Sequence, residues 1–190
     1  MYDKIAISYL ENRINLKSGK YLKQLLKFLP KRSLILDLGC GAGVPVDDIL
    51  LKAGHQVIGI DISPRQIANA RKYCPGGEYL VGDIGELKTD EYQAQAIVCF
   101  YTIFHIQRSR QSELLRVMGS YLPSGGMLLI TMGDREFEGE HMMHGESMWA
   151  SQYGTAKNRA MVETAGFDVI LDEVDTSGGE RHQVIMGVKL

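Results

Sequence analysis

The chain has 190 residues, of which 45% are hydrophobic and 23% are charged, as in an ordinary globular protein. We expect a single domain over residues 1–190. Its 21 Lys and Arg residues nearly balance 23 Asp and Glu residues, giving a formal net charge of -2, and the basic residues are scattered. Nucleic acid is therefore disfavoured as the main partner, because its phosphates need a concentrated basic surface.

The sequence carries no mark of a secreted, membrane or metal-binding protein. The three cysteines are an odd number without CxxC spacing, which predicts neither a disulfide framework nor a zinc site. His141 and His144 lack an evident third ligand, so we expect no metal. The first residues lack the apolar core of a signal peptide, and no stretch approaches roughly 18 apolar residues. We expect a cytoplasmic protein that does not bind membranes.

Strand-like and helix-like patterns alternate along most of the chain. A helical leucine pattern from Leu22 to Leu29 ends at Pro30. Short apolar runs, typical of strands buried on both faces, follow at residues 34–38, 57–60, 79–81, 96–100 and 127–131. Helical patterns separate them at residues 46–53, 64–73 and 109–122.

The last third breaks this rhythm. Residues 134–153 hold many Met, His and aromatic residues without a clean period, so we expect an irregular and functional loop. A helix at 155–165 ends at Gly166, and two strands at 168–174 and 182–188 follow. The pattern predicts an α/β fold, a doubly wound, seven-stranded, mostly parallel sheet with a C-terminal antiparallel hairpin.

Ligands of such sheets bind at the carboxyl ends of the strands. The first strand runs into a glycine-rich turn, Gly39 to Gly43, where bare backbone can approach a ligand beside a helix start. The second strand ends at Asp61, 20 residues after Gly41, an offset at which an acid can accept both hydroxyls of a ribose. These features predict a cofactor that contains a ribose.

The spacing of the glycines separates two cofactor classes. The dinucleotide fingerprint needs its third glycine where this chain has Val44, and the extra glycine comes one residue early at Gly43. Asp37, just before the turn, suits an amino group better than a pyrophosphate, because a carboxylate repels phosphates. The turn therefore departs from the NAD pattern.

Residues 36–43, Leu-Asp-Leu-Gly-Cys-Gly-Ala-Gly, resemble the signature of class I S-adenosylmethionine-dependent methyltransferases of the small-molecule type. Three further segments, 59–63, 82–84 and 122–128, resemble this family's ribose-binding strand end, its adenine-binding turn and the turn before its fifth strand. Together they cover residues 34–131 in the family's order. The resemblance implies a Rossmann-like methyltransferase fold, with S-adenosyl-L-methionine as the cofactor.

The resemblance implies a role for each matching residue. The turn of Gly39, Cys40 and Gly41 would hold the methionine part of the cofactor. Asp37 would lie near the ammonium group, and Phe100 would offer it a carbonyl.

The adenosine part would lie at the ends of the next strands. Asp61 would hold the ribose, and Asp83 would accept a hydrogen bond from the adenine amine. Ile62 and Ile84 would sandwich the adenine ring. Core packing for the two isoleucines, and turn or cap roles for the two acids, are the alternatives.

Two segments would cover the site. Residues 1–30, with Tyr9, resemble the family's N-terminal helical lid, and an ordinary helix face is the alternative for Tyr9. The loop at 134–153 would close over the acceptor and exclude water. Its apolar wall would consist of Met148, Trp149 and Tyr153.

Tyr101 and His105 follow the fourth strand, beside the expected position of the methyl group. His105 is the best candidate for a general base, because an imidazole titrates near neutral pH. A packing or pocket-shaping role is the alternative, since positioning of the reactants alone can supply ~7 to 11 kcal/mol.

We expect an enzyme that moves a methyl group to an oxygen or nitrogen of a small-molecule acceptor, as a monomer or homodimer. Two other functions stay open at this point: a nicotinamide-dependent oxidoreductase, and a non-catalytic S-adenosylmethionine-binding partner of another methyltransferase.

Overall fold

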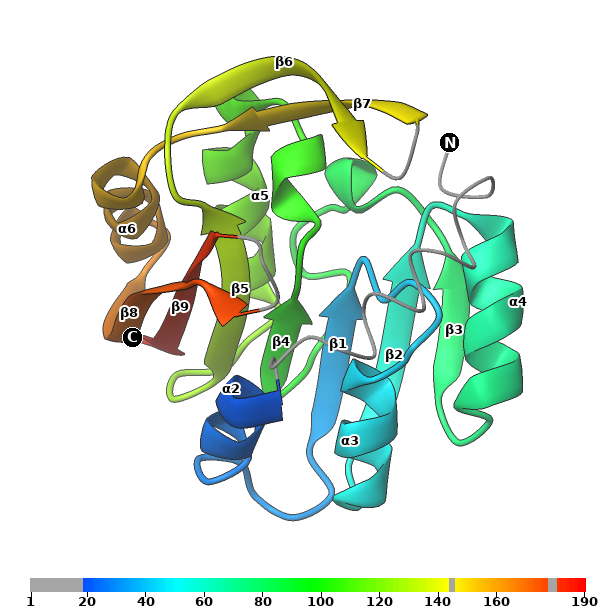
Figure 1. The fold of residues 1–190 in the computed structure, drawn as a ribbon. Coiled ribbons are helices and arrows are strands. Elements are labelled where there is room, and N and C mark those ends of the chain that lie inside the picture. The colour runs from blue at the N-terminus through cyan, green and yellow to red at the C-terminus, as the bar shows by residue number, and fades with distance from the viewer. Residues whose placement is uncertain (1–18, 144–145, 178–180) are drawn as a thin grey trace.

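A computed structural model of the protein describes residues 19–143, 146–177 and 181–190. Within these residues one seven-stranded sheet forms the centre, with the order β3-β2-β1-β4-β5-β9-β8 (Figure 1). Its strands are β1 (Leu34–Leu38), β2 (Gln56–Asp61), β3 (Glu78–Val81), β4 (Ala96–Cys99), β5 (Met127–Gly133), β8 (Phe167–Asp175) and β9 (His182–Lys189). The α-helices are α2 (Gly19–Leu25), α3 (Val46–Lys52), α4 (Pro64–Tyr73), α5 (Arg108–Ser120) and α6 (Thr155–Thr164). Two 3-10 turns, η1 (Ile84–Glu86) and η2 (Ile103–His105), follow β3 and β4.

The pairing of the strands confirms the predicted fold. Strands β1 to β5 pair in parallel, and β9 lies antiparallel between β5 and β8. The strand order reverses between β1 and β4, and in such sheets the crevice at this point is where ligands bind.

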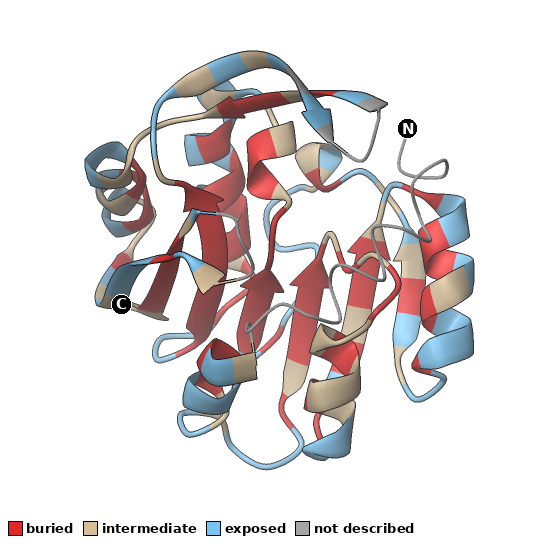
Figure 2. Ribbon diagram, viewed as in Figure 1, coloured by how far each residue is buried: buried red, intermediate tan, exposed pale blue. Residues whose placement is uncertain are grey.

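Helices cover both faces of the sheet (Figures 1 and 2). On one face, Leu114 and Met118 of α5 and Val162 of α6 pack against buried residues of the strands. On the other face, Leu22 of α2 and Leu50 of α3 do the same. Figure 2 shows the central strands as mostly buried and the outer sides of the helices as exposed, which explains the continuous apolar runs of the strands.

The first helix is shorter than its leucine pattern predicts. Helix α2 ends at Leu25, and the next amides form tighter turns, with Phe28 N donating to Leu25 O at 3.0 Å. The side chain of Phe28 is exposed, so no packing extends the helix to Leu29. Tyr9 and the rest of residues 1–18 lie outside the described residues.

The expectation of an irregular loop at 134–153 is wrong. These residues contain β6 (Phe137–Met143) and β7 (Glu146–Gln152), which pair as an antiparallel hairpin. Met148 and Ala150 are buried, whereas Trp149 between them is only partly buried, so burial alternates over residues 147–150 of β7. The alternation ends at Ser151, which is fully buried, and small and polar residues obscure it in the sequence. In Figure 1 the hairpin crosses above the carboxyl ends of β4 and β5.

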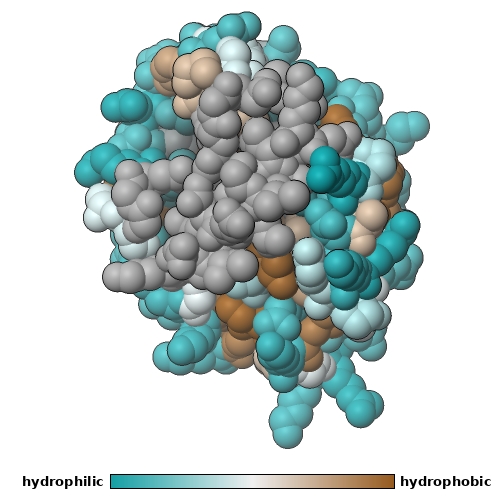
Figure 3. Space-filling model, turned by 45° about the vertical axis from the view of Figure 1, so that its right-hand side comes forward, coloured by the Kyte–Doolittle hydropathy of each residue, from teal (hydrophilic) through white to brown (hydrophobic). Residues whose placement is uncertain are grey.

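Hydrophilic residues dominate the described surface seen in Figure 3, with smaller apolar areas among them. The large exposed apolar side chains are spread over several elements, with Tyr73 in α4, Met142 in β6 and Ile170 in β8. In the described part of the chain, none of the helices combines the length and apolarity that a membrane crossing requires.

The buried side chain of Asn158 fixes α6 to the sheet. Its Nδ2 donates to Gly133 O at 2.7 Å and to Gln183 Oε1 at 2.9 Å. We predict that Asn158→Leu lowers the free energy of unfolding by about 1–3 kcal/mol, because both acceptors lose a buried donor. Urea denaturation measures this effect. The control Lys157→Ala, at an exposed neighbour, should change stability by less than about 0.5 kcal/mol, and an equal loss in both variants would contradict the assignment.

Candidate functional site

A cleft of about 160 Å³ lies at the carboxyl ends of β1, β2 and β4. The described residues that line it come from the glycine turn, the ends of β2 and β3, the first turn of α4, and the segment after β4. They are Gly39, Gly41, Asp61, Ile62, Gln66, Gly82, Asp83, Ile84, Tyr101, Thr102, His105 and Ile106. The cleft therefore occupies the place where the strand order reverses.

The glycine turn presents bare backbone to this cleft. Gly39 and Gly41 have φ values of 82° and 55°, which favour glycine. A β-carbon at Gly39 would overlap the side chain of Thr102, so the turn and the end of β4 approach as closely as only glycine allows. A β-carbon at Gly41 would meet no other atom within 4 Å. Because Gly41 lines the cleft, any side chain there would occupy space that a ligand could use.

Asp61 connects the end of β2 to the glycine turn. Its Oδ2 accepts a hydrogen bond from Gly41 N at 2.9 Å, and its Oδ1 accepts one from Ser63 N at 2.8 Å. These two bonds fix the plane of the carboxylate at the edge of the cleft. A carboxylate oxygen can accept more than one hydrogen bond, so the group can hold hydroxyls of a ligand as well.

A pair of buried carboxyl groups lies behind the turn. Asp37 is 2% exposed and Asp47 is fully buried, and the two interact with each other. Burial raises the pKa of Asp37 to about 7, with a smaller contribution from the charge of Asp61. Burial also raises the pKa of Asp47 well above its usual value, and the charge of Asp37 adds to this. Asp37 does not line the cleft, so its role near an ammonium group stays a prediction.

The segment after β4 is held in an unusual conformation. Tyr101 has a φ of 56°, which is strained for a residue with a side chain, and its N–H donates to Thr131 Oγ1 at 2.5 Å. Thr102 Oγ1 donates to Phe100 O at 2.9 Å. The Phe100 carbonyl thus has a partner within the chain, and it keeps a second lone pair for a ligand.

The ends of β2 and β3 contribute one exposed and one buried isoleucine to the cleft. Ile62 is 58% exposed, whereas Ile84 is 5% exposed and also packs in the core. Asp83 Oδ1 accepts a hydrogen bond from Gly85 N at 2.8 Å, so this acid does cap η1. The predicted hydrogen bond of Asp83 to an adenine amine would use its other oxygen.

Segment η2 lies against β7. His105 lines the cleft, and its Nδ1 lies 3.1 Å from Trp149 O. Met148 is 2% exposed and Trp149 is partly buried. Tyr153 lies beneath the guanidinium of Arg108, 5.4 Å from ring centre to Cζ.

The cleft brings together eight of the residues that the sequence singled out, namely Gly39, Gly41, Asp61, Ile62, Asp83, Ile84, Tyr101 and His105. Other predicted residues lie outside its lining: Asp37, Cys40, Phe100, Met148, Trp149 and Tyr153. Sequence reasoning missed Gln66, Thr102 and Ile106. The N-cap Ser63 could have indicated Gln66, because the first turn of a helix that follows a strand end faces the ligand.

Comparison with known proteins identifies relatives of this fold. Residues 35–126 match the family model described as "Methyltransferase domain". The match and the strand order first define the class of fold, a Rossmann-like methyltransferase sheet. More closely, the matched segment is similar to the class I S-adenosylmethionine-dependent methyltransferases. S-adenosylmethionine is the cofactor of this family, and the bare backbone at Gly41 beside the Asp61 carboxylate fits it.

Two curated relatives have different acceptors in their names. Trans-aconitate 2-methyltransferase of Escherichia coli O7:K1 is 27% identical over 161 residues, covering 83% of this chain, and the chain spans 61% of that protein's length. The 18S rRNA (guanine-N(7))-methyltransferase of Bos taurus is 36% identical over 69 residues, which cover 36% of this chain and 24% of the relative.

A solved structure shares the fold across nearly the whole chain. It is the 1,6-didemethyltoxoflavin-N1-methyltransferase of Burkholderia thailandensis, with 1,6-didemethyltoxoflavin and S-adenosylhomocysteine bound. The TM-score is 0.75 at 15% identity, covering 99% of this chain and 83% of that one.

Substitutions at Gly39 and Gly54 distinguish two costs of adding a side chain. One is the cost of a positive φ, and the other is the cost of a steric overlap. Both have a positive φ, but a β-carbon at Gly54 would meet nothing within 4 Å. We predict that Gly54→Ala costs about 1–2 kcal/mol of unfolding free energy from its φ alone. Gly39→Ala should cost about 1–3 kcal/mol more, because the methyl group displaces Thr102. Urea denaturation of both variants measures the difference, and equal losses would show that the turn and β4 are not in close contact.

The buried carboxyl pair predicts how stability depends on pH. Folding favours the protonated forms, so the pair's contribution is complete below about pH 4 and is lost as the pH rises through 7. We predict that Asp47→Asn becomes more stable than the natural chain as the pH rises, by up to about 1.4 kcal/mol per pH unit for each carboxyl that titrates.

Unfolding in urea between pH 5 and pH 8 measures this trend. The control Asp48→Asn changes the next residue of α3, whose carboxylate pairs with Lys52 at the surface. Its pH profile should run parallel to that of the natural chain. If the profile of Asp47→Asn also ran parallel to that of the natural chain, the claim that folding favours the protonated forms of this carboxyl pair would be wrong.

Proposed function

We propose that the chain transfers the methyl group of S-adenosylmethionine to an oxygen or nitrogen atom of a small-molecule acceptor. The observation that carries the proposal is the Asp61 carboxylate, held by Gly41 N and Ser63 N at the edge of a cleft that bare glycine backbone lines. Two neighbouring strand ends thus offer a carboxylate and an open backbone surface at one place. A ribose next to an amino-acid chain suits this pair of features.

The residues of the cleft have separate tasks in this proposal. Asp61 accepts hydrogen bonds from the ribose hydroxyls, and Ile62 and Ile84 cover the two faces of the adenine ring. The exposure of Ile62, 58%, supports this role, because an adenine would remove that apolar side chain from water. Asp83 accepts from the adenine amine. Gly39 and Gly41, with Cys40 between them, lie along the methionine part.

The ammonium group of the cofactor would lie between the Phe100 carbonyl and the Asp37 carboxyl. A positive charge near Asp37 favours its ionised form, so binding would lower the raised pKa of this group. Tyr9 remains part of the proposal as a lid residue, although it lies outside the described residues.

When bound, the cofactor supplies a methyl group attached to a positively charged sulfur. An oxygen or nitrogen nucleophile can take this methyl group. Tyr101 and His105 would hold the acceptor so that its nucleophilic atom faces this methyl group. His105 would take the proton that the acceptor loses as the methyl carbon exchanges its bond to the sulfur for a bond to the acceptor atom, which leaves S-adenosylhomocysteine. The hairpin residues Met148, Trp149 and Tyr153 keep water away from the reacting atoms.

The acceptor class draws support from the relatives. Two of the methyltransferases that align with most of this chain are named for trans-aconitate and for a didemethyltoxoflavin, which are small molecules. The match to the rRNA enzyme covers only 36% of this chain. It does not favour an RNA acceptor.

Binding of S-adenosylhomocysteine tests the proposal. Calorimetry should give a dissociation constant in the micromolar range for the natural chain, and NADH should not bind. We predict that Asp61→Ala weakens the binding by about 2–4 kcal/mol, because the ribose loses its charge-assisted hydrogen bonds. The control Asp168→Ala removes an exposed carboxylate from β8 and should leave the affinity unchanged. Unchanged affinity in Asp61→Ala would refute the ribose assignment.

A further inference from the structure

One buried amide joins the β6–β7 hairpin to the turn that carries His105. Gln111 of α5 is 1% exposed, and its Nε2 lies 2.7 Å from Ser151 O of β7. The same nitrogen lies 3.1 Å from Ile103 O and 3.0 Å from Ile106 O, at the two ends of η2. An amide nitrogen carries two hydrogens, so the three carbonyls share them and are drawn toward one point.

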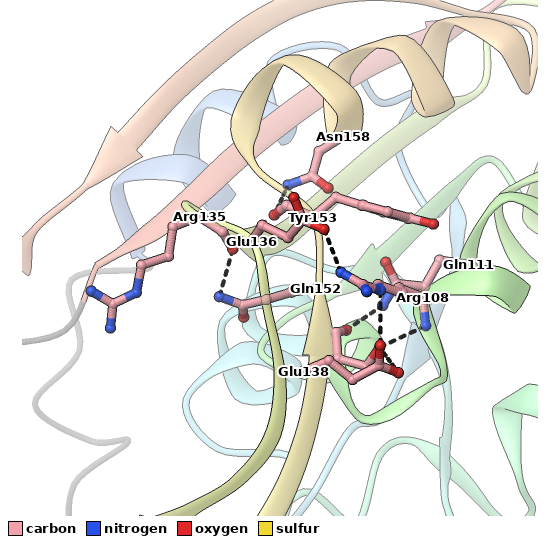
Figure 4. A network of polar contacts seen from close by, with 9 residues as sticks. Arg108, Gln111, Arg135, Glu136, Glu138, Gln152, Tyr153 and Asn158 are labelled. Atoms are coloured by element: carbon pink, nitrogen blue, oxygen red, sulfur yellow. Dashed lines mark hydrogen bonds and ion pairs between the residues drawn. The ribbon is translucent and has the colours of Figure 1, made fainter.

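A second group of contacts fixes the hairpin to the start of α5 (Figure 4). Arg108 N donates to Ser151 Oγ at 2.9 Å, and Ser151 Oγ lies 3.2 Å from Glu138 Oε1 of β6. The guanidinium of Arg108 pairs with Glu138 at 2.9 Å and with Glu136 at 2.6 Å. Both strands of the hairpin are therefore tied to the helix that follows η2.

These contacts position the backbone carbonyl that faces the side chain of His105. Trp149 precedes Ser151 by two residues on β7, and its carbonyl oxygen lies 3.1 Å from His105 Nδ1. A backbone carbonyl only accepts hydrogen bonds, so Nδ1 must carry the hydrogen. In the neutral ring the basic atom is then Nε2. A neutral imidazole in water favours the opposite tautomer, with the hydrogen on Nε2, so the surroundings must impose this one.

We propose that Gln111 is a positioning residue for His105. By holding η2 and β7 at a fixed separation, it places the Trp149 carbonyl against Nδ1 and so makes Nε2 the atom that accepts a proton. The inference rests on the proposed function in one respect: the proton is the one that the methyl acceptor loses. Gln111 itself does not line the cleft.

Nitrogen NMR of the histidine side chains tests this inference on the purified full chain without cofactor. The protein is labelled with ¹⁵N-histidine and kept at a pH above 8, where the imidazoles are neutral. The signals of His105 are those that disappear in His105→Gln. The natural chain should show a protonated Nδ1 and an unprotonated Nε2 at His105.

Gln111→Met keeps the length of the side chain but has no donor for the three carbonyls. We predict that the His105 signals of this variant shift toward the Nε2-protonated tautomer, while those of His55 and His182 stay in place. Ser151→Ala loosens the same contact by removing the acceptor of Arg108 N, and it should shift the His105 signals in the same direction. The matched control Gln107→Met changes an exposed glutamine next to the same helix and should shift nothing.

An Nε2-protonated His105 in the natural chain would overturn the proposal. So would unchanged His105 signals in folded Gln111→Met. If Gln111→Met does not fold, the natural chain and Ser151→Ala still decide the question. The measurement needs no cofactor, so failure of S-adenosylhomocysteine to bind would count against the proposed function and not against this inference.

Discussion

The hydrogen bond between Asp61 and the backbone of Gly41 is the contact on which the site depends. It joins the ends of two adjacent parallel strands, which the backbone bond from Gly39 N to Ile60 O at 2.7 Å also holds together. With the turn fixed in this way, Gly41 presents open backbone to the cleft. Thr102, at the end of β4, then packs against Gly39 from the other side. Three strand ends thus become one binding surface.

The site contains features that cost folding free energy. Two carboxyl groups are buried behind the glycine turn, and Tyr101 adopts a φ that costs energy. Such features persist only where the surrounding structure fixes them. Here β1 and β4 are buried along almost their whole length, with Leu36 and Ile97 fully inaccessible. The core therefore tolerates a strained edge at which a ligand can be recognised.

The sequence predicted those parts of the fold and the site that depend on residues close together in the chain. Continuous apolar runs predicted the parallel strands, and the interval from Gly41 to Asp61 predicted which strand ends meet, because both signals are local. The antiparallel β8–β9 pair was also predicted from its turn and its apolar pattern. For these parts of the fold the backbone has few alternatives.

Other features depend on contacts between distant residues and left no local signal. Gln111 meets Ser151 across 40 positions of sequence, and nothing in its helix pattern distinguishes it from a solvated glutamine. The hairpin was missed because Gly139, Ala150 and Ser151 weaken its alternation. The buried state of Asp47 was equally hidden, since an acid in the first turn of a helix usually lies in solvent.

A crystal structure with S-adenosylhomocysteine tests the central claim most directly. The account predicts that both ribose hydroxyls lie within hydrogen-bond distance of the Asp61 carboxylate, with the adenine between Ile62 and Ile84. It also predicts that the amino-acid part runs along Gly39 and Gly41. A ligand bound elsewhere on the molecule, or a ribose turned away from Asp61, would contradict it.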